Sequence, residues 1–178
     1  MNKKTLWITE TAVMIALLVA LQWATKPLGQ FVTGSCVNLV LGVSVLVGGL
    51  WCGLTVALVS PFFAFLLGIG PAFLPMVPCV SLGNAVYALL FGLFVGKYLK
   101  EKKPAAAYVS MALAAAAKFV TLFVVLVRLV VPHVVPEAKL SVVTASFTWP
   151  QLLTAVIGGI IACLIAPTLR RALEKKNG

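Results

Sequence analysis

The sequence predicts an all-α integral membrane protein, a bundle of six transmembrane helices that forms a single domain over residues 1–178. The chain is 62% hydrophobic and only 10% charged. Residues 27–96 contain no Asp, Glu, Lys, Arg or His, whereas one bilayer crossing needs about 20 apolar residues. The Lys and Arg residues gather in clusters beside apolar segments, which is typical of a protein that crosses the membrane several times.

The crossings follow from the apolar segments and their breakers. We expect them, in order, at about residues 6–25, 36–50, 55–69, 81–98, 105–131 and 150–169. The glycine-rich junction 48–53 predicts either a tight turn between the second and third helices or a break within one helix, and a break would leave five crossings. Residues 71–78 carry three prolines and are expected to be irregular. Residues 132–148 are expected to form a polar connection.

The positive charges predict the orientation. Three clusters hold 10 of the 14 Lys and Arg residues: Lys3 and Lys4; Lys97, Lys100, Lys102 and Lys103; and Arg170, Arg171, Lys175 and Lys176. The positive-inside rule places them, and therefore both termini, in the cytoplasm. The N-terminus resembles a secretory signal, but Glu10 interrupts its apolar run and no pair of small residues follows, so cleavage is not expected.

Lys118 is the main candidate for binding chemistry. It lies 14 residues after Pro104, which is ~20 Å along a helix and therefore near the middle of the bilayer. A cation at that depth costs ~2.5 kcal/mol or more and normally faces a cavity or a partner. Apart from Glu10 near one surface, the spans contain no acidic residue. A bound anion is the expected partner; the alternative is that the flexible stem reaches toward a water-filled vestibule.

Other polar residues are expected near Lys118. Thr121 lies on the face between Lys118 and Arg128, and Arg128 is either a second anion contact or an interfacial anchor. Trp149 is either a stacking platform or an interfacial belt residue. Asn38 is a weaker candidate that equally suits an interhelical hydrogen bond. The predicted ligand-binding set is Gln30, Asn84, Tyr87, Lys118, Thr121, Arg128, Trp149 and Gln151.

Catalytic motifs are not found. No two carboxylates lie close enough for acid–base work, and neither His-Glu-x-x-His nor Gly-x-Ser-x-Gly occurs. Residues 92–97 are one residue short of a phosphate loop, and Tyr98 replaces its Ser or Thr. The four cysteines stand singly in apolar surroundings, and His133 has no neighbouring His or Cys. We therefore expect no catalytic residues, no ATPase activity, no metal and no cofactor.

Small residues repeat at four-residue intervals on the first span, at Ala12, Ala16 and Ala20. They form a flat stripe that another helix can approach closely. With this stripe, its size and its six expected spans, the chain resembles the substrate-binding S component of energy-coupling factor (ECF) vitamin transporters. The expected loops 29–34 and 71–78 and the segment 82–85 also look similar to that family.

The resemblance implies a membrane-embedded, high-affinity binding subunit of an ATP-driven importer in the bacterial plasma membrane. The ligand would bind near the outer face, and the alanine stripe would dock on a transmembrane coupling subunit that works with two cytoplasmic ATPases. The local charge favours an anionic vitamin or precursor, such as a folate- or pantothenate-like carboxylate, over thiamine. Two alternatives stay open: a stand-alone carrier or channel, and a non-transport assembly subunit or lipid-acting enzyme.

Overall fold

The computed structural model describes residues 2–177, except for the side chains of Lys3 and of residues 173–177. Every regular element in this part is helical, as predicted. Five helices are long and apolar enough to cross a membrane: Lys4–Leu28, Gln30–Gly48, Met76–Lys100, Pro104–Val134 and Glu137–Ala172. A further apolar helix, Leu50–Leu66, has 17 residues, so a sixth crossing stays a prediction. Lys3, Lys175 and Lys176 of the basic clusters have side chains outside the described part.

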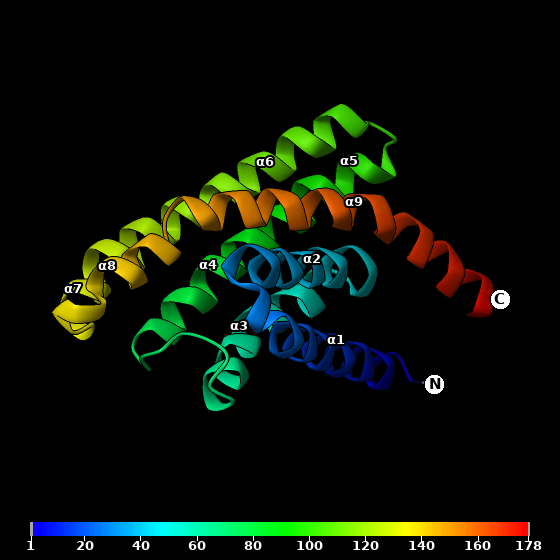
Figure 1. Ribbon diagram of the computed structural model, residues 1–178. Coiled ribbons are helices and arrows are strands. Elements are labelled where there is room, and N and C mark those ends of the chain that lie inside the picture. Colours follow the sequence, from blue (N-terminus) through cyan, green and yellow to red (C-terminus); the bar gives the residue numbers. More distant parts are fainter. Residues whose placement is uncertain (1, 178) are drawn as a thin grey trace.

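The first three helices follow one another through short turns (Figure 1), with Gly29 before α2 and Gly49 before α3. Helix α1 covers Lys3–Thr25 and continues into a short 3₁₀ turn, η1, at Lys26–Leu28; α2 covers Gln30–Gly48 and α3 covers Leu50–Leu66. Gly29 and Gly49 have φ of 85° and 89°, a conformation open almost only to glycine. A Cβ placed on Gly53 would lie 3.1 Å from the Val45 Cα. The chain therefore folds back at Gly49, and the junction 48–53 is a turn rather than a break.

The second half consists of two long composite helices and a pair at the C-terminal end. The first composite joins α4 (Met76–Leu90), a π-helical turn η2 (Phe91–Val95) and α5 (Gly96–Lys100). The second joins α6 (Pro104–Thr121), a longer π-helical stretch η3 (Leu122–Val130) and α7 (Val131–Val134). They are followed by α8 (Glu137–Ser146) and α9 (Trp149–Asn177). Residues 92–97 are thus helical and form no phosphate-binding loop.

Three expectations about the connections were wrong in part. The connection 132–148 contains a helix, α8. Residues 30–34, expected to be a loop, form the first turn of α2, because Gly29 supplies the sharp bend immediately before them. The proline-rich segment is irregular only as far as Pro75, since α4 begins at Met76. Pro78 fits the first helical turn, where a backbone N–H has no intrahelical acceptor to lose.

The core forms where α2 and α9 touch. A Cβ placed on Gly158 would lie 2.5 Å from the Ser35 carbonyl oxygen, and one placed on Gly42 would lie 2.7 Å from the Ala162 Cβ. Such close approach lets backbones gain dispersion contact in a membrane. Helix α1 is more peripheral, with 11% of its span buried against 39–44% in the other four candidates.

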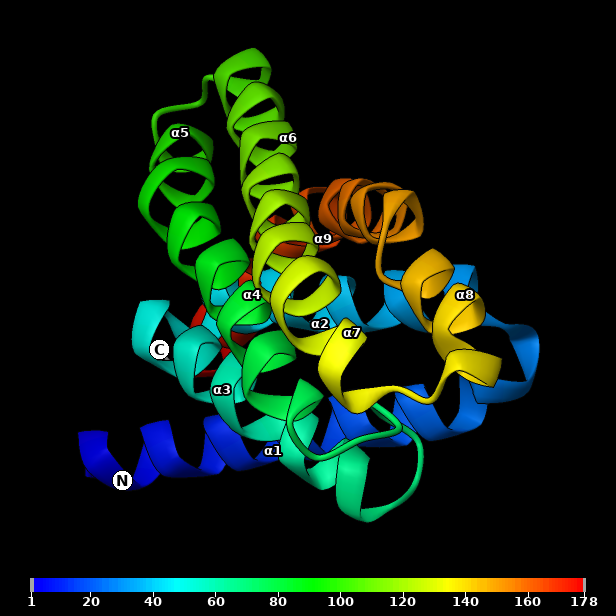
Figure 2. The same ribbon diagram turned by 90° about the vertical axis from the view of Figure 1, so that its left-hand side faces the viewer.

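The molecule has two distinct ends. In both ribbon views the N-terminal end of α1, the C-terminal end of α9 and the turn between α5 and α6 lie toward one side, and α7 and α8 lie toward the other (Figures 1 and 2). The three basic clusters belong to the first of these ends. Near the second end, the helices enclose a cavity.

Candidate functional site

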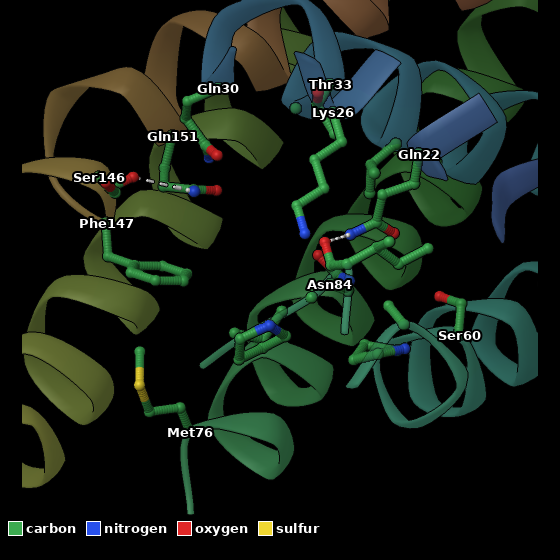
Figure 3. Close-up of a pocket in the computed structure, with 18 of the residues that line it drawn as sticks. Gln22, Lys26, Gln30, Thr33, Ser60, Met76, Asn84, Ser146, Phe147 and Gln151 are labelled. Atoms are coloured by element: carbon green, nitrogen blue, oxygen red, sulfur yellow. Dashed lines mark hydrogen bonds between the residues drawn. The ribbon is translucent and has the colours of Figure 1, made fainter. Parts of the chain in front are cut away.

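The cavity has a volume of about 320 Å³ and lies among seven α-helices and the loop after α3. Helix α1 contributes Gln22, α2 contributes Asn38, α3 contributes Ser60, α4 contributes Asn84 and α6 contributes Lys118. Helices α8 and α9 and residues 69–72 complete the wall. Figure 3 shows ten of the lining residues by name. The size falls within the range of small-molecule sites, ≈300–1,000 Å³.

Lys118 is the central charge of this cavity. Its side chain is 2% exposed, and its Nζ donates to Asn38 Oδ1 at 2.6 Å and to Asn84 Oδ1 at 2.7 Å. The same Nζ lies 5.6 Å from the centroid of the Tyr87 ring, which attracts cations through its electron-rich face. An ammonium group has three donors, and these two amide oxygens use two of them.

The two asparagines are held in defined orientations. Asn38 Nδ2 donates to the Gly34 carbonyl oxygen at 2.8 Å and to Thr154 Oγ1 at 3.4 Å, so its Oδ1 faces Lys118. The second of these bonds joins α2 to α9, the interhelical bond that was considered for Asn38. Asn84 turns its Oδ1 to Lys118, which leaves its Nδ2 as a further donor at the cavity wall. The polar floor of the cavity is therefore cationic and rich in donors.

Ser60 stands out on α3. Its side chain is 1% exposed, and its Oγ is the one buried side-chain polar atom without a hydrogen-bond partner in the described part of the chain. Serines in apolar helices commonly bond the carbonyl four residues earlier, as Ser44 does with Val40 at 2.7 Å. A buried hydroxyl without a partner is costly, so the Ser60 hydroxyl is available to a bound molecule.

The cavity rim is tied to the loop after α3. Lys26 Nζ donates to the Gly68 carbonyl oxygen at 2.6 Å, and Gln22 Nε2 donates to the Ile69 carbonyl oxygen at 3.1 Å. On the opposite wall Gln151 Nε2 donates to the Ser146 carbonyl oxygen at 3.2 Å, above the ring of Phe147 (Figure 3). In the described part of the chain, the amide oxygens of Gln22 and Gln151 accept no hydrogen bond.

Four of the eight predicted residues line the cavity: Gln30, Asn84, Lys118 and Gln151. Tyr87 lies beneath it, fully buried, with its hydroxyl donating to the Ala155 carbonyl oxygen at 3.1 Å and its ring supporting Lys118. Tyr87 therefore positions the lysine without being part of the wall.

Thr121, Arg128 and Trp149 do not line the cavity. Thr121 Oγ1 donates to the Ala117 carbonyl oxygen at 2.8 Å. The Arg128 guanidinium is exposed and lies 5.2 Å from the Phe123 ring. Trp149 is 58% exposed and packs against Phe31, with ring centroids 5.4 Å apart. The π-helical stretch η3 explains why Arg128 does not face the cavity. Its wider turns change the register that a regular α-helix would keep after Lys118.

Sequence reasoning did not select Gln22, Lys26 or Ser60. Gln22 and Lys26 are four residues apart at the end of α1 and therefore share one helix face, which was a usable signal. Ser60 carried none, since a serine beside Pro61 in an apolar segment is unremarkable until its surroundings are known. The sequence predicts a connection at residues 132–148 and therefore gives no sign of α8 or of its part in the cavity wall.

Apolar helices surrounding a cavity with a buried lysine define the class of this molecule: a multi-pass membrane protein with a cavity of small-molecule size inside its bundle. The chain matches the family model described as ECF transporter, substrate-specific component, over residues 7–170. It belongs to this family, and it is therefore a substrate-binding transporter subunit that works with the other subunits of an ECF module. Comparisons with curated proteins and with solved structures gave no match.

Proposed function

We propose that this subunit captures a small anionic vitamin or vitamin precursor with high affinity from the outer face of a bacterial plasma membrane. The observation that carries the proposal is the charge of the cavity. Lys118 and Lys26 line it, and no Asp or Glu occurs among its described lining residues. The Lys118 amine is held by neutral amides and has no acidic counter-charge among the described residues of the cavity, and an anionic group of the ligand would supply that charge.

The ligand would use the donors that the protein leaves unused. A carboxylate accepts hydrogen bonds and donates none when ionised, so it complements the third Lys118 donor and Asn84 Nδ2. The amide oxygens of Gln22 and Gln151 would accept from neutral N–H or O–H groups elsewhere on the same molecule. A carboxylate-bearing precursor of the pantothenate or folate kind has this combination of groups, whereas the cationic thiamine would meet repulsion from Lys118.

The predicted topology accompanies this proposal. One domain over residues 1–178 would cross the membrane six times, with the short helix α3 added to the five longer spans. Both termini would then lie in the cytoplasm. The cavity then faces the outside, since it lies near the end opposite the basic clusters. Loading from the outer surface would follow from this orientation.

Release into the cell would depend on partners. Ala12, Ala16 and Ala20 are all exposed on the peripheral helix α1, and small side chains permit close helix contact. We propose this stripe as the docking surface for the transmembrane coupling subunit. Two cytoplasmic ATPase subunits of the module would supply the energy.

Mass spectrometry of small molecules carried through purification is the direct test. We expect one tightly bound anion. Equilibrium binding of a panel of vitamins at neutral pH should then show that carboxylates bind and that thiamine does not. The panel should be repeated with inorganic anions as a control for charge alone. Preferential binding of a cationic vitamin would contradict the proposal.

A further inference from the structure

A second hollow lies at the end of the bundle that carries the basic clusters. Its volume is about 730 Å³, and it is formed by the C-terminal part of α2, the start of α3, the segment η2–α5 and the C-terminal part of α9. It shares no lining residue with the ligand cavity. We call it the basal groove.

One part of the basal groove is strongly basic. Lys97, Lys100, Arg170 and Arg171 line it, and Glu101 is the one acidic residue among its described lining residues. Glu101 is engaged from outside the groove, because its Oε2 lies 2.9 Å from Nζ of Lys103, which is not part of the lining. This hydrogen bond lowers the pKa of Glu101 and raises the pKa of Lys103. The pair is ionised at neutral pH, and the groove keeps an excess of positive charge.

The other part of the basal groove is apolar and shallow-walled. Val45, Leu46 and Leu50 form one side, and Gly92 and Gly96 expose the backbone of η2 and α5 on the other. A Cβ placed on Gly92 would lie 2.8 Å from Leu50 Cδ1, whereas one on Gly96 would have ordinary contact, 3.6 Å, with Leu46 Cδ2. Gly96 therefore has room for a side chain, and Lys97 follows it directly in the groove lining.

The groove lies at the end of a candidate membrane span. Lys97 and Lys100 are in the last turn of the span Met76–Lys100, so in a bilayer the basic part would lie at the headgroup level and the apolar part beside the hydrocarbon. This order matches a phospholipid, with its charged headgroup above its acyl chains. Basic pockets between transmembrane helices are known to bind acidic headgroups. A soluble anion would use the basic part alone.

We propose that the basal groove binds an anionic phospholipid, with the phosphate against Lys97, Lys100 and Arg171 and an acyl chain beside Gly96 and Leu46. The lipid fills the space between α2, α5 and α9, and it holds these three helix ends together at the membrane surface. The site is separate from the ligand cavity, so lipid binding and vitamin capture use different residues.

Native mass spectrometry of the full chain tests this, with phosphatidylglycerol and phosphatidylcholine of matched acyl chains as probes. We expect phosphatidylglycerol to be retained preferentially. The triple variant Lys97→Gln, Lys100→Gln, Arg171→Gln should lose this preference, with at least ~10-fold weaker retention, since each basic residue near an anionic headgroup adds to its binding. The control variant Lys4→Gln, Lys102→Gln, Lys139→Gln removes the same charge from exposed positions outside the groove and should retain the lipid.

Gly96→Leu separates a lipid from a soluble anion. Gly96 has φ of −59° and room for a side chain, so the variant should fold, which its thermal midpoint checks. Leucine would fill the apolar part without changing any charge, and we expect it to weaken phosphatidylglycerol retention while inorganic phosphate has no effect on retention in either protein. Three outcomes would overturn the proposal: equal retention of both lipids, the same loss of phosphatidylglycerol in the control variant, or displacement of the lipid by inorganic phosphate. So would groove variants that keep the lipid but lose the coupling subunit, which would make the groove a protein-docking surface.

Discussion

At the scale of single residues, Lys118 shows what depth alone predicts and what it does not. Its position on the fifth apolar segment predicted a buried cation without an acidic neighbour, and the structure confirms its burial. Its partners in the structure are the oxygens of Asn38 and Asn84. These bonds compensate part of the desolvation penalty of an ammonium group, and they orient the cation beside the cavity before any ligand arrives.

Replacing Lys118 by Ala should weaken ligand binding at least tenfold, which is about 1.4 kcal/mol, because the charge that neutralises the anion is lost. Equilibrium binding of the identified ligand measures this, with thermal unfolding as the check on folding. Lys139→Ala, an exposed lysine on α8 outside the cavity, is the matched control and should bind normally. A folded Lys118→Ala variant with an unchanged dissociation constant would remove Lys118 from the site.

Ser60→Ala should affect stability and binding in opposite directions. The ligand-free protein should be as stable as the parent or more stable, since a buried hydroxyl without a partner costs about 1–3 kcal/mol. Ligand binding should weaken, by about 0.5–1.5 kcal/mol for one neutral hydrogen bond. Thermal midpoints with and without ligand measure both effects.

Ser44→Ala is the control for Ser60→Ala. Ser44 is also a buried helical serine, but its hydroxyl is bonded to the Val40 carbonyl oxygen and it does not line the cavity. This variant should leave ligand binding unchanged. If Ser60→Ala behaves like Ser44→Ala in binding, the Ser60 hydroxyl does not contact the ligand.

At the scale of elements, composition predicted helices well and their ends less well. The apolar segments all became helices, because a backbone in lipid must satisfy its own hydrogen bonds. The sequence did not predict the turn at Gly29 or the helix α8. It also left the junction at Gly49 open, since a glycine-rich junction suits both a turn and a break. The π-helical stretch η3 was also hidden, and it determines where Arg128 points.

Helix α1 yields a prediction about assembly. Ala16→Trp should spare ligand binding but abolish co-purification with the coupling subunit, because an indole would hold the two helices apart. Co-expression with an ECF module and affinity purification measures the association. Ala112→Trp, an exposed alanine on α6, is the matched control and should still associate. Persistent association of the Ala16 variant would exclude the stripe as the docking surface.

At the scale of the whole molecule, the basic clusters and the ligand cavity lie toward opposite ends. The described part of the chain has five helices long enough to cross a membrane and one apolar helix of 17 residues. Because α3 is joined to α2 by a one-residue turn that folds the chain back, counting α3 as a crossing places both termini on one side. The orientation then follows from the positive-inside rule.

Single cysteines test this topology. In a variant without Cys36, Cys52, Cys79 and Cys163, a cysteine at position 102 should react with an impermeant thiol reagent only from the cytoplasmic side. A cysteine at position 139 should react only from the outside, because α8 lies near the opposite end. Intact cells and inverted vesicles supply the two sides. Labelling of both positions from the same side would contradict the crossing by α6–α7, and reversed labelling would contradict the predicted orientation.

The sequence by itself determined that this chain is a helical membrane protein with a buried cation, because the absence of charge over a long segment has no other stable solution in water or in lipid. It also singled out four residues of the cavity wall, Gln30, Asn84, Lys118 and Gln151, from the polar residues that interrupt apolar segments. Only the tertiary structure decided which of these residues meet, which glycine reverses the chain, and that Ser60 has no partner. Those facts depend on contacts between helices distant in sequence, and helix periodicity carries no information about them.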